Sequence, residues 1–418
     1  MDSGAILLLP VSGGEARVLL RPPQGQFFSS PDFHPTQRRL AYFVCSNPTF
    51  RRCQIMVVDL AADWSPSGTP RPVTGSPINN AYNLQWTPDG NDLTYHTEQS
   101  FLSYLWRVSA SGGTPVRLEI AGAGANDLTV SPRGNRAAFG RANRDFDIWT
   151  MDEKGVSKKL IGSSLADTRG QYSPDGKRIA FATARSEQFE IWVANADGSG
   201  QVPLTNGPSI YQGSPSWSPD GKQIAYDAQD PGTLVFQIWM ADSAGGTPRQ
   251  ITRLPKGASF PRWSRDGGSI YFFSQADGRP EIFRIPAAGG PETQITRNGG
   301  YTAHESGDGK TLYFTKGAFG RGIFSLPLAG GPEKPVIDDQ SVSSAFAVVS
   351  DGIYFCRRKP GTSMEMCFHD LATGKVRVIG KIEGLFAGPI SVSPDRKSIL
   401  FAQSLQNDTN LMLIENFR

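Results

Sequence analysis

A short motif recurs along this chain and limits it to a repeat architecture. Residues 217–252 read WSPDGKQIAYDAQDPGTLVFQIWMADSAGGTPRQIT, with a Pro-Asp-Gly turn, two strand-like runs and a Gly-Gly turn before a third run. Proline presets such a turn, aspartate bonds its own backbone, and glycine accepts positive φ. The turn residue recurs at Pro35, Pro88, Pro132, Pro174, Pro219, Arg265, Gly307 and Pro394. With a degenerate copy at 347–357 there are nine units of about 45 residues, the period of four-stranded propeller blades.

Both faces of the recurring strands are apolar, whereas a half-exposed sheet alternates apolar with polar residues. This pattern predicts an all-β propeller of nine four-stranded blades in a single domain, 1–418, with repeats from residue 21 onward. We expect a strand at 15–20, within a closing region 1–20, to pair with the last blade at 410–417 and close the ring. Eight blades with an irregular insertion are the alternative, because the first step between units is longer than the next ones.

The composition excludes several classes of protein. The 42 basic and 39 acidic residues leave a net charge of +3, which gives no argument for direct nucleic-acid binding. The N-terminal apolar run covers only residues 5–9, so we expect neither a membrane span nor a signal peptide in this segment. The four histidines form no metal-binding motif, and we expect no metal and no cofactor.

The repeats resemble those of a known family. WSPDGKQIAY and QIWMADSAGG are similar to the repeats of TolB-like, WD-repeat-like propellers, and this resemblance covers nearly the whole chain. The tail, from GIYFCRR at 352–358 to NLMLIENFR at 410–418, resembles the C-terminal propeller of CadC-type bacterial winged-helix regulators. The resemblance implies a binding or sensor role and a periplasmic or extracellular location, with the cytoplasm as the alternative.

Four cysteines flank the same loop in two units, the one between the second and third strands. They are Cys45 and Cys53 in the first unit and Cys356 and Cys367 in the eighth. Directly opposed residues of an antiparallel pair share a constant index sum, and the sums for the two cysteine pairs differ by one. We expect two cross-strand disulfides and hence an oxidising compartment. Four buried thiols are the alternative.

No residue pattern predicts catalysis. The turn aspartates, such as Asp220, recur because they stabilise the turn backbone. The Gly-Gly turns lack the spacing and the following helix of a phosphate-binding loop. We therefore expect no catalytic residues, and a function other than that of an enzyme.

The loops between second and third strands vary freely and carry the candidate site. They hold eleven Lys/Arg and six Asp/Glu, with aromatic residues beside several arginines. Variable loops on a repeat scaffold are common recognition surfaces, and arginine and aromatic residues are favoured anchors. The candidate contact residues, including aromatics from the links between blades, are Arg51, Arg52, Phe101, Arg144, Arg185, Tyr211, Tyr301, Phe319, Arg321, Arg357 and Arg358.

These observations predict a binding or sensor propeller that recognises a protein, or an anionic glycan or peptide, on its loop face. A hydrolase or lyase with its site at the mouth of the central channel is the alternative function. For the loop residues themselves, an ordinary solvated rim is the alternative.

Overall fold

The chain forms two compact units. The computed structural model describes residues 4–46, 52–99, 102–131, 135–143, 145–207, 209, 211–276, 278–317, 322–361, 363–406 and 408–417. Unit 1 consists of Met1–Arg144 with Asp408–Arg418, and unit 2 consists of Asp145–Asn407. In the described residues the regular structure is β-strand apart from one short 3₁₀ helix, η1 (Glu119–Ala121), which confirms the all-β prediction.

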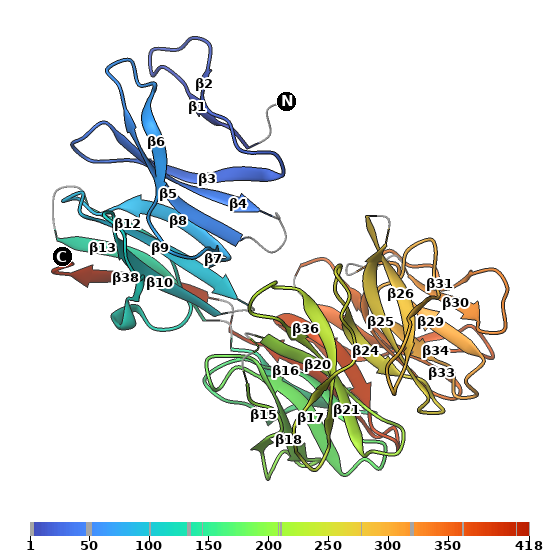
Figure 1. Cartoon of the computed structure of the whole chain (residues 1–418). Helices are drawn as coiled ribbons and strands as arrows, with labels where there is room; N and C mark the ends of the chain where they lie inside the picture. The colour runs from blue at the N-terminus through green and yellow to red at the C-terminus, as the bar shows by residue number, and fades with distance from the viewer. Residues whose placement is uncertain are drawn as a thin grey trace. The chain divides into compact units, whose positions relative to one another are not determined.

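Unit 1 contains a hairpin and three larger antiparallel sheets (Figure 1). In strand order they are β1 (Ile6–Leu8) and β2 (Arg17–Leu20); β3 (Gln26–Phe33), β4 (Arg39–Ser46), β5 (Arg52–Leu60) and β6 (Pro66–Pro72), with β7 (Ile78–Asn79) also on β5; β8 (Ala81–Trp86), β9 (Asp92–Gln99), β10 (Leu102–Ser109) and β11 (Val116–Arg117); and β12 (Ala125–Val130), β13 (Arg136–Asn143) and β38 (Asp408–Glu415).

Apolar clusters join these sheets in a row. One cluster, around Phe43 and Trp86, joins the β3–β6 sheet to the β8–β11 sheet. Another, around Leu105 and Phe139, joins the β8–β11 sheet to the sheet of β12, β13 and β38. The β1–β2 hairpin packs on the other face of the β3–β6 sheet, where Leu19 is buried against residues of β4 and β5.

Unit 2 contains six four-stranded antiparallel sheets among its described residues. They are β36 (Leu385–Val392), β37 (Ser398–Ser404), β14 (Asp147–Asp152) and β15 (Ser157–Ile161); β16 (Asp167–Tyr172), β17 (Arg178–Thr183), β18 (Glu190–Asn195) and β19 (Val202–Pro203); β20 (Tyr211–Trp217), β21 (Gln223–Gln229), β22 (Phe236–Asp242) and β23 (Arg249–Gln250); β24 (Ser259–Trp263), β25 (Ser269–Ala276), β26 (Arg279–Pro286) and β27 (Thr293–Gln294); β28 (Ala303–Glu305), β29 (Thr311–Phe314), β30 (Ile323–Pro327) and β31 (Lys334–Ile337); and β32 (Val342–Val348), β33 (Gly352–Arg358), β34 (Met364–Asp370) and β35 (Val376–Ile382).

Six apolar clusters connect these six sheets in a cycle. Each cluster contains buried residues from two sheets that follow one another in the chain. The sixth joins the β32–β35 sheet to the sheet of β36, β37 and β14, through residues such as Cys356, Met366 and Phe401. Every sheet of unit 2 is therefore packed on both faces, as the apolar pattern of the strands predicts.

The third repeat is divided between the two units. Its first two strands, β12 and β13, form a sheet in which β13 also pairs with β38 from the end of the chain (Figure 1). Its third strand, β14, pairs with β37. Arg136 of β13 lies opposite Glu415 of β38, and Ser398 of β37 lies opposite Asp152 of β14. Both third strands therefore end with an acidic residue at the same register, and each occupies the place that the sequence repeat gives to the other.

The ring closure expected from the sequence differs from the observed pairing. Among the described residues, β2 pairs with β1 and β38 pairs with β13, so the strand at 15–20 does not pair with the one at 410–417. The β1–β2 hairpin needs only a short loop, whose closure costs less entropy than pairing the two ends of the chain. The nine repeats contribute sheets to both compact units.

The structure confirms one of the two expected disulfides. Cys45 and Cys53 lie directly opposite each other on β4 and β5 and form a disulfide. The prediction for Cys356 and Cys367 is wrong, since both are free, buried thiols. Cys356 faces Met366 and Cys367 faces Phe355, so the index sums that differ by one place these cysteines on opposite faces of the sheet.

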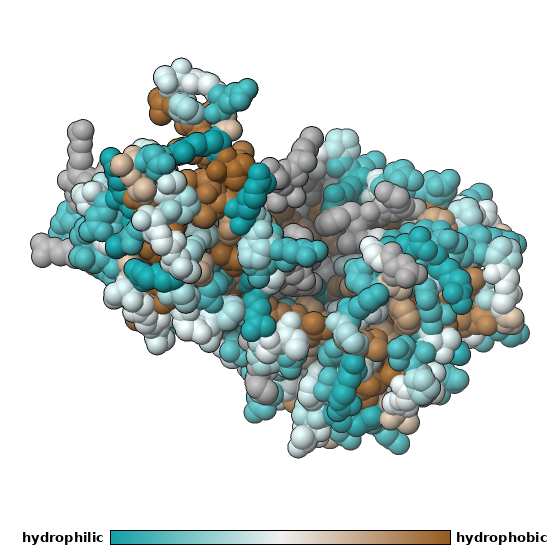
Figure 2. Space-filling model, turned by 45° about the horizontal axis from the view of Figure 1, so that its top comes forward, coloured by the Kyte–Doolittle hydropathy of each residue, from teal (hydrophilic) through white to brown (hydrophobic). Residues whose placement is uncertain are grey.

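The visible surface of both units is mostly hydrophilic, with hydrophobic residues in separate patches (Figure 2). Exposed hydrophobic side chains include Leu411 and Leu413 of β38, which are 82% and 59% exposed. None of the described residues belongs to a helix with the length and apolar character needed to span a membrane.

Candidate functional site

Unit 2 has a pocket at one mouth of its ring, on the side of the loops between second and third strands. This loop-face pocket has a volume of about 400 Å³. The first strands of neighbouring sheets, such as β16 and β36, contact one another around the axis and supply much of its wall. Its lining residues are Arg169, Phe260, Arg262, Tyr301, Thr302, Ser343, Ser344, Ala345, Arg358, Gly361, Ser363, Met364, Leu385, Phe386, Gly388 and Pro389.

Arg169 enters the pocket from a bulge in β16. The pairing of β16 with β17 shifts register between Thr168 and Gln171, and Arg169 has a φ of 58°. A bulge re-aims the side chain of its extra residue. As a result, Nη1 of Arg169 donates to the hydroxyl of Ser214 at 3.1 Å, and its guanidinium lies 5.1 Å from the ring centroid of Phe260. Ser214 and Phe260 are themselves bulge residues with positive φ, so three successive sheets direct such residues toward the axis.

Arg262 is the most deeply buried cation of the pocket. The residue is 7% exposed, and neither its Nε nor its Nη1 has a hydrogen-bond partner among the described residues. Burial, together with the charge of Arg169, lowers the pKa of Arg262 to about 10. Arg262 therefore remains a cation at neutral pH, with two nitrogen atoms whose N–H groups have no acceptor among the described residues.

Asp227 is the buried carboxylate nearest to these cations. It is 2% exposed, and its Oδ2 accepts a hydrogen bond of 2.9 Å from the backbone N–H of Phe260. Burial raises the pKa of Asp227, although the charges of Arg169 and Arg262 oppose this shift. One carboxylate facing two guanidinium groups leaves an excess of positive charge at the base of the pocket.

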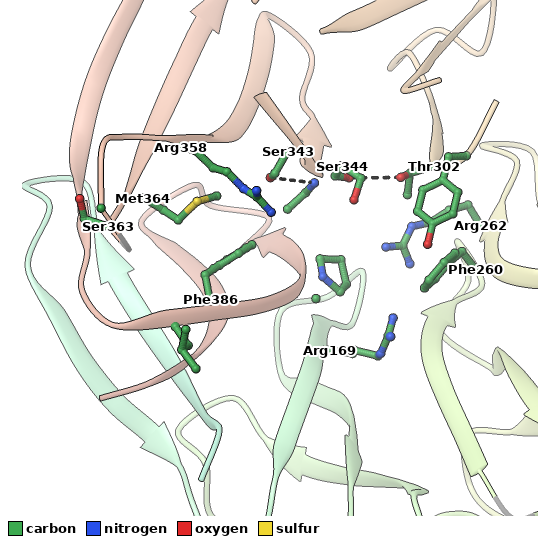
Figure 3. Close-up of a pocket in the computed structure, with 16 residues that line it drawn as sticks. Arg169, Phe260, Arg262, Thr302, Ser343, Ser344, Arg358, Ser363, Met364 and Phe386 are labelled. Carbon is green, nitrogen blue, oxygen red and sulfur yellow. Dashed lines mark hydrogen bonds between the residues drawn. The ribbon is translucent and has the colours of Figure 1, made fainter. Parts of the chain in front are cut away.

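Aromatic side chains and a third arginine complete the pocket. The ring of Tyr301 packs against Phe260 and Phe273, with centroids 5.2 Å and 4.8 Å apart. Figure 3 shows Arg169, Arg262 and Arg358 reaching toward the same space from three sides, with Phe386 across from Phe260. Arg358 is exposed at the rim, whereas Arg262 lies at depth. The pocket thus offers guanidinium groups at two levels beside an aromatic wall.

Comparison of the sequence with known protein families identifies a family of β-propeller domains, in agreement with this fold. The family described as the TolB beta propeller domain matches residues 14–209 and 171–347, which together exceed half of the chain. The chain belongs to the TolB beta propeller domain family.

Individual relatives of this TolB-family chain match shorter parts of it. An uncharacterized protein of Agrobacterium fabrum is 28% identical over 198 residues, 45% of this chain and 64% of that protein. The uncharacterized peptidase YuxL of Bacillus subtilis is 36% identical over 124 residues, 28% of this chain and 19% of that protein. The chain thus spans less than two thirds of the length of these relatives.

Among solved structures, a protein provisionally assigned as TolB from Agrobacterium tumefaciens has a TM-score of 0.54 and 19% identity. The match covers 62% of this chain and 98% of that one, and at this identity it shows a shared fold.

Two of the predicted contact residues of this TolB-family propeller lie together in the pocket, namely Tyr301 and Arg358. Tyr211 lies near Arg169 but is 7% exposed, with its ring packed against Phe189 and Phe236. Arg52, by contrast, is an exposed residue at the start of β5 in unit 1. The predicted residues outside the described part of the chain are Arg51, Phe101, Arg144, Phe319 and Arg321.

The remaining two predicted residues make internal ion pairs. Nη2 of Arg185 donates to Asp167 at 2.9 Å, and its guanidinium lies 5.3 Å from the ring centroid of Trp192. Nε of Arg357 donates to Glu365 at 2.9 Å, a cross-strand neighbour. These contacts stabilise their own sheets, so a ligand would have to compete with a carboxylate that is already present.

The sequence prediction missed Arg169, Arg262 and Asp227. Asp227 ends a second strand that reads IAYD, at a position that the other repeats fill with Phe43, His96, Gly140, Ala182, Phe273, Thr315, Cys356 and Ala402. Arg169 and Arg262 lie on first strands, five and three residues before the turn residue of their units. These residues could have been found by looking for charged side chains at repeat positions that line the axis, and not only in the variable loops.

The described residues contain no group of three or more His, Cys, Asp or Glu side chains arranged to hold a metal ion. The pocket's chemistry accordingly comes from guanidinium, hydroxyl and aromatic groups. Guanidinium groups bind anions, and the aromatic side chains provide surfaces for apolar rings.

Proposed function

We propose that this TolB-family propeller is a non-catalytic binding module whose loop-face pocket takes up an acidic segment of a protein or peptide. The observation that carries the proposal is Arg262, a buried guanidinium in a pocket of about 400 Å³, whose Nε and Nη1 find no acceptor in the part of the chain that the structure describes. A charge removed from water without a partner costs several kcal/mol. A ligand carboxylate supplies the missing acceptor and recovers part of this cost.

The rest of the pocket supports an acidic ligand with an apolar or aromatic part. Arginine binds carboxylates through paired N–H donors, and such charge-assisted bonds are roughly twice as strong as neutral ones. Phe260, Tyr301 and Phe386 provide an aromatic surface beside the cations. Arg358 at the rim would meet the ligand first and increase the rate of association through its charge.

The Cys45–Cys53 disulfide supports a location in an oxidising compartment, so we place the protein in the periplasm or outside the cell. A sensor role, in which the bound ligand reports a condition outside the cytoplasm, is consistent with the resemblance of the tail to CadC-type regulators.

The proposal is tested with the full chain and a fluorescent peptide of six glutamates ending in phenylalanine. We expect saturable binding that weakens as salt rises, and no binding of the matched hexaglutamine peptide. Arg358→Gln should weaken binding at least tenfold. Arg357→Gln is the control, because it removes the same charge from a neighbouring residue that is paired with Glu365. Equal effects of the two substitutions, or equal binding of both peptides, would exclude the pocket as an acidic-peptide site.

A peptidase is the second candidate function, because 28% of the chain is 36% identical to the uncharacterized peptidase of Bacillus subtilis. The chain spans only 19% of that relative, so the likeness concerns a limited part of it. Purified protein incubated with peptide and ester substrates distinguishes the two functions. Turnover that is lost on substitution of a pocket residue would favour the enzyme over the binding module. Preferential binding of an anionic glycan over the peptide would instead favour a glycan-binding role.

A further inference from the structure

The opposite mouth of unit 2's ring has a second hollow, with a volume of about 530 Å³. It lies at the ends of the first strands, where the Pro-Asp-Gly turns begin, and prolines of these turns, such as Pro174 and Pro219, form part of its edge. We name it the turn-face hollow. Arg262 lines both this hollow and the loop-face pocket, so its guanidinium lies between the two.

Three nitrogen-bearing side chains surround the axis of the turn-face hollow at one level, to which β20 also contributes Ser216. Gln171, Arg262 and His304 each lie three residues before the turn residue of their unit and belong to β16, β24 and β28. Equivalent positions in a repeat fold occupy equivalent places in space. The ring therefore brings these three side chains from separate sheets toward a common centre.

Each of the three side chains has a buried atom without a hydrogen-bond partner in the described structure. These atoms are Nε2 of Gln171, Nε and Nη1 of Arg262, and Nε2 of His304. Buried polar atoms in folded proteins are almost always satisfied by the protein, by water or by a ligand. Four unsatisfied atoms around one axis therefore require partners, either from water or from a ligand.

All of these atoms can donate hydrogen bonds. The Gln171 amide nitrogen and the Arg262 nitrogens are donors only. Burial, with the charges of Arg262 and Arg265, holds the pKa of His304 well below its ordinary value, so its imidazole is neutral and carries one N–H. With that proton on Nε2, the group requires an acceptor at its centre. A metal cation is disfavoured there by the charge of Arg262.

Two other charged groups of the hollow, Glu305 and Arg396, already have charged or hydrogen-bonding partners, and Nη2 of Arg265 donates to the backbone carbonyl of Val348 at 3.4 Å. Glu305 accepts hydrogen bonds of 2.7 Å from the hydroxyl of Tyr271 and from the backbone N–H of Arg265. Arg396 pairs with Asp351 at 2.7 Å. Arg262, whose Nε and Nη1 have no acceptor in the described structure, is the cation that a small anion would neutralise first.

We propose that the turn-face hollow binds a small oxyanion, a phosphate or carboxylate group, on Gln171, Arg262 and His304. The site opens at the opposite mouth of the ring from the acidic-peptide site and shares Arg262 with it, but it does not require that the peptide function be correct. Because Arg262 lines both cavities, an anion on one side also reduces the positive charge available to the other. We expect the two ligands to weaken each other's binding.

The test measures binding of inorganic phosphate to the full chain by calorimetry and thermal melting, with chloride adjusted to constant ionic strength. We expect saturable binding and a rise in melting temperature. Acetate in a parallel titration distinguishes a carboxylate site from a phosphate site. Water alone in the hollow predicts no difference between phosphate, acetate and chloride, and that result would overturn the proposal.

Gln171→Leu with His304→Leu removes two of the donors. We expect at least tenfold weaker phosphate binding, with hexaglutamate-phenylalanine binding unchanged. Arg358→Gln is the converse control and should weaken only the peptide. Unaltered phosphate affinity in the double variant would place the anion elsewhere. Should that variant fail to fold, the ¹⁵N resonance of His304 Nε2 in the unmodified protein decides the question, since it must shift as phosphate saturates the site.

Discussion

The two units solve the same packing problem in different ways. In unit 2, six sheets are joined in a cycle, so no sheet is terminal and each packs on both faces. In unit 1, three sheets are joined in a row, and the two terminal sheets have outer faces that no third sheet of the unit covers. The β1–β2 hairpin covers one of these faces. On the last sheet of the row, Leu411 and Leu413 of the edge strand β38 are exposed.

Covalent stabilisation follows the same division. The disulfide lies in the first sheet of unit 1, whereas both cysteines of unit 2 are free and packed within clusters of the cycle. Each sheet of a closed cycle packs against two neighbouring sheets, and both buried interfaces stabilise the folded state. The terminal sheets of a row each have only one such interface, which stabilises the row less. The disulfide adds stability to unit 1 by restricting its unfolded chain.

The largest expected effect comes from opening the cycle. Phe401 on β37 is 1% exposed and belongs to the cluster that joins the last sheet of unit 2 to its neighbour. Phe401→Ala should lower the free energy of unfolding by about 3–5 kcal/mol, because it leaves a cavity at this joint. Denaturant unfolding of the full chain measures the loss. Leu405→Ala, at an exposed position just beyond β37, is the control and should change the stability by less than about 0.5 kcal/mol.

A smaller effect is expected from removing the disulfide of unit 1. Replacing Cys45 and Cys53 by alanine should lower the stability of unit 1 by about 2–3 kcal/mol, from the entropy of a short cross-linked loop. Reducing agent should produce a similar loss in the native protein and none in the double variant. A lower stability in the unfolding transition of unit 2, with unit 1 unchanged, would contradict the assignment of this stabilisation to unit 1.

The smallest effect concerns a titratable group at the start of unit 2. Burial, with Asp147 and Asp167 adding to it and Lys159 opposing it, holds the pKa of Asp145 at about 6, above its ordinary 3.8. The protonated acid is favoured in the folded state, so the stability it contributes is present below pH 3.8 and lost as the pH rises through 6. Asp145→Asn should therefore be more stable than the native protein by about 1 kcal/mol at pH 8, after allowance for solvent screening, and equal to it near pH 3.

The control for this titration has the opposite sign. Hydrogen bonds from Ser173 and Lys177 lower the pKa of the turn residue Asp175. Its stabilising effect is present above the ordinary pKa and lost as the pH falls through the lowered one. Asp175→Asn should thus destabilise the protein at neutral pH. Thermal melts of both variants across the pH range would contradict the assignment of Asp145 if the two profiles ran in parallel.

The strands and their grouping in fours could be predicted from the sequence, because the repeat states which residues are buried. The partner of β13 could not. β14 and β38 carry similar apolar patterns and end in Asp152 and Glu415 at the same register, so local pairing rules accept either strand. The cysteine pairs show the same sensitivity. A difference of one residue in register separates the disulfide of unit 1 from two thiols on opposite faces in unit 2.

The candidate site was predicted less completely. Variation among loops led to Arg358, and the aromatic links between blades led to Tyr301, both of which line the loop-face pocket. Loop variation also selected Arg185 and Arg357, because the sequence does not show that Asp167 and Glu365 lie opposite them. Arg169 escaped attention because a bulge in β16 turns it toward the axis, and a bulge leaves little trace in a single sequence.

The pairing of β13 with β38 determines the order in which the chain can assemble during synthesis. Every strand of unit 2 precedes residue 408, so its six sheets can form as soon as residues 145–407 have left the ribosome. β13 must wait, with one edge unpaired, until β38 has been translated. A pairing across so large a separation is slow to form. The inserted unit therefore matures first, and the unit that encloses it in the sequence is completed last.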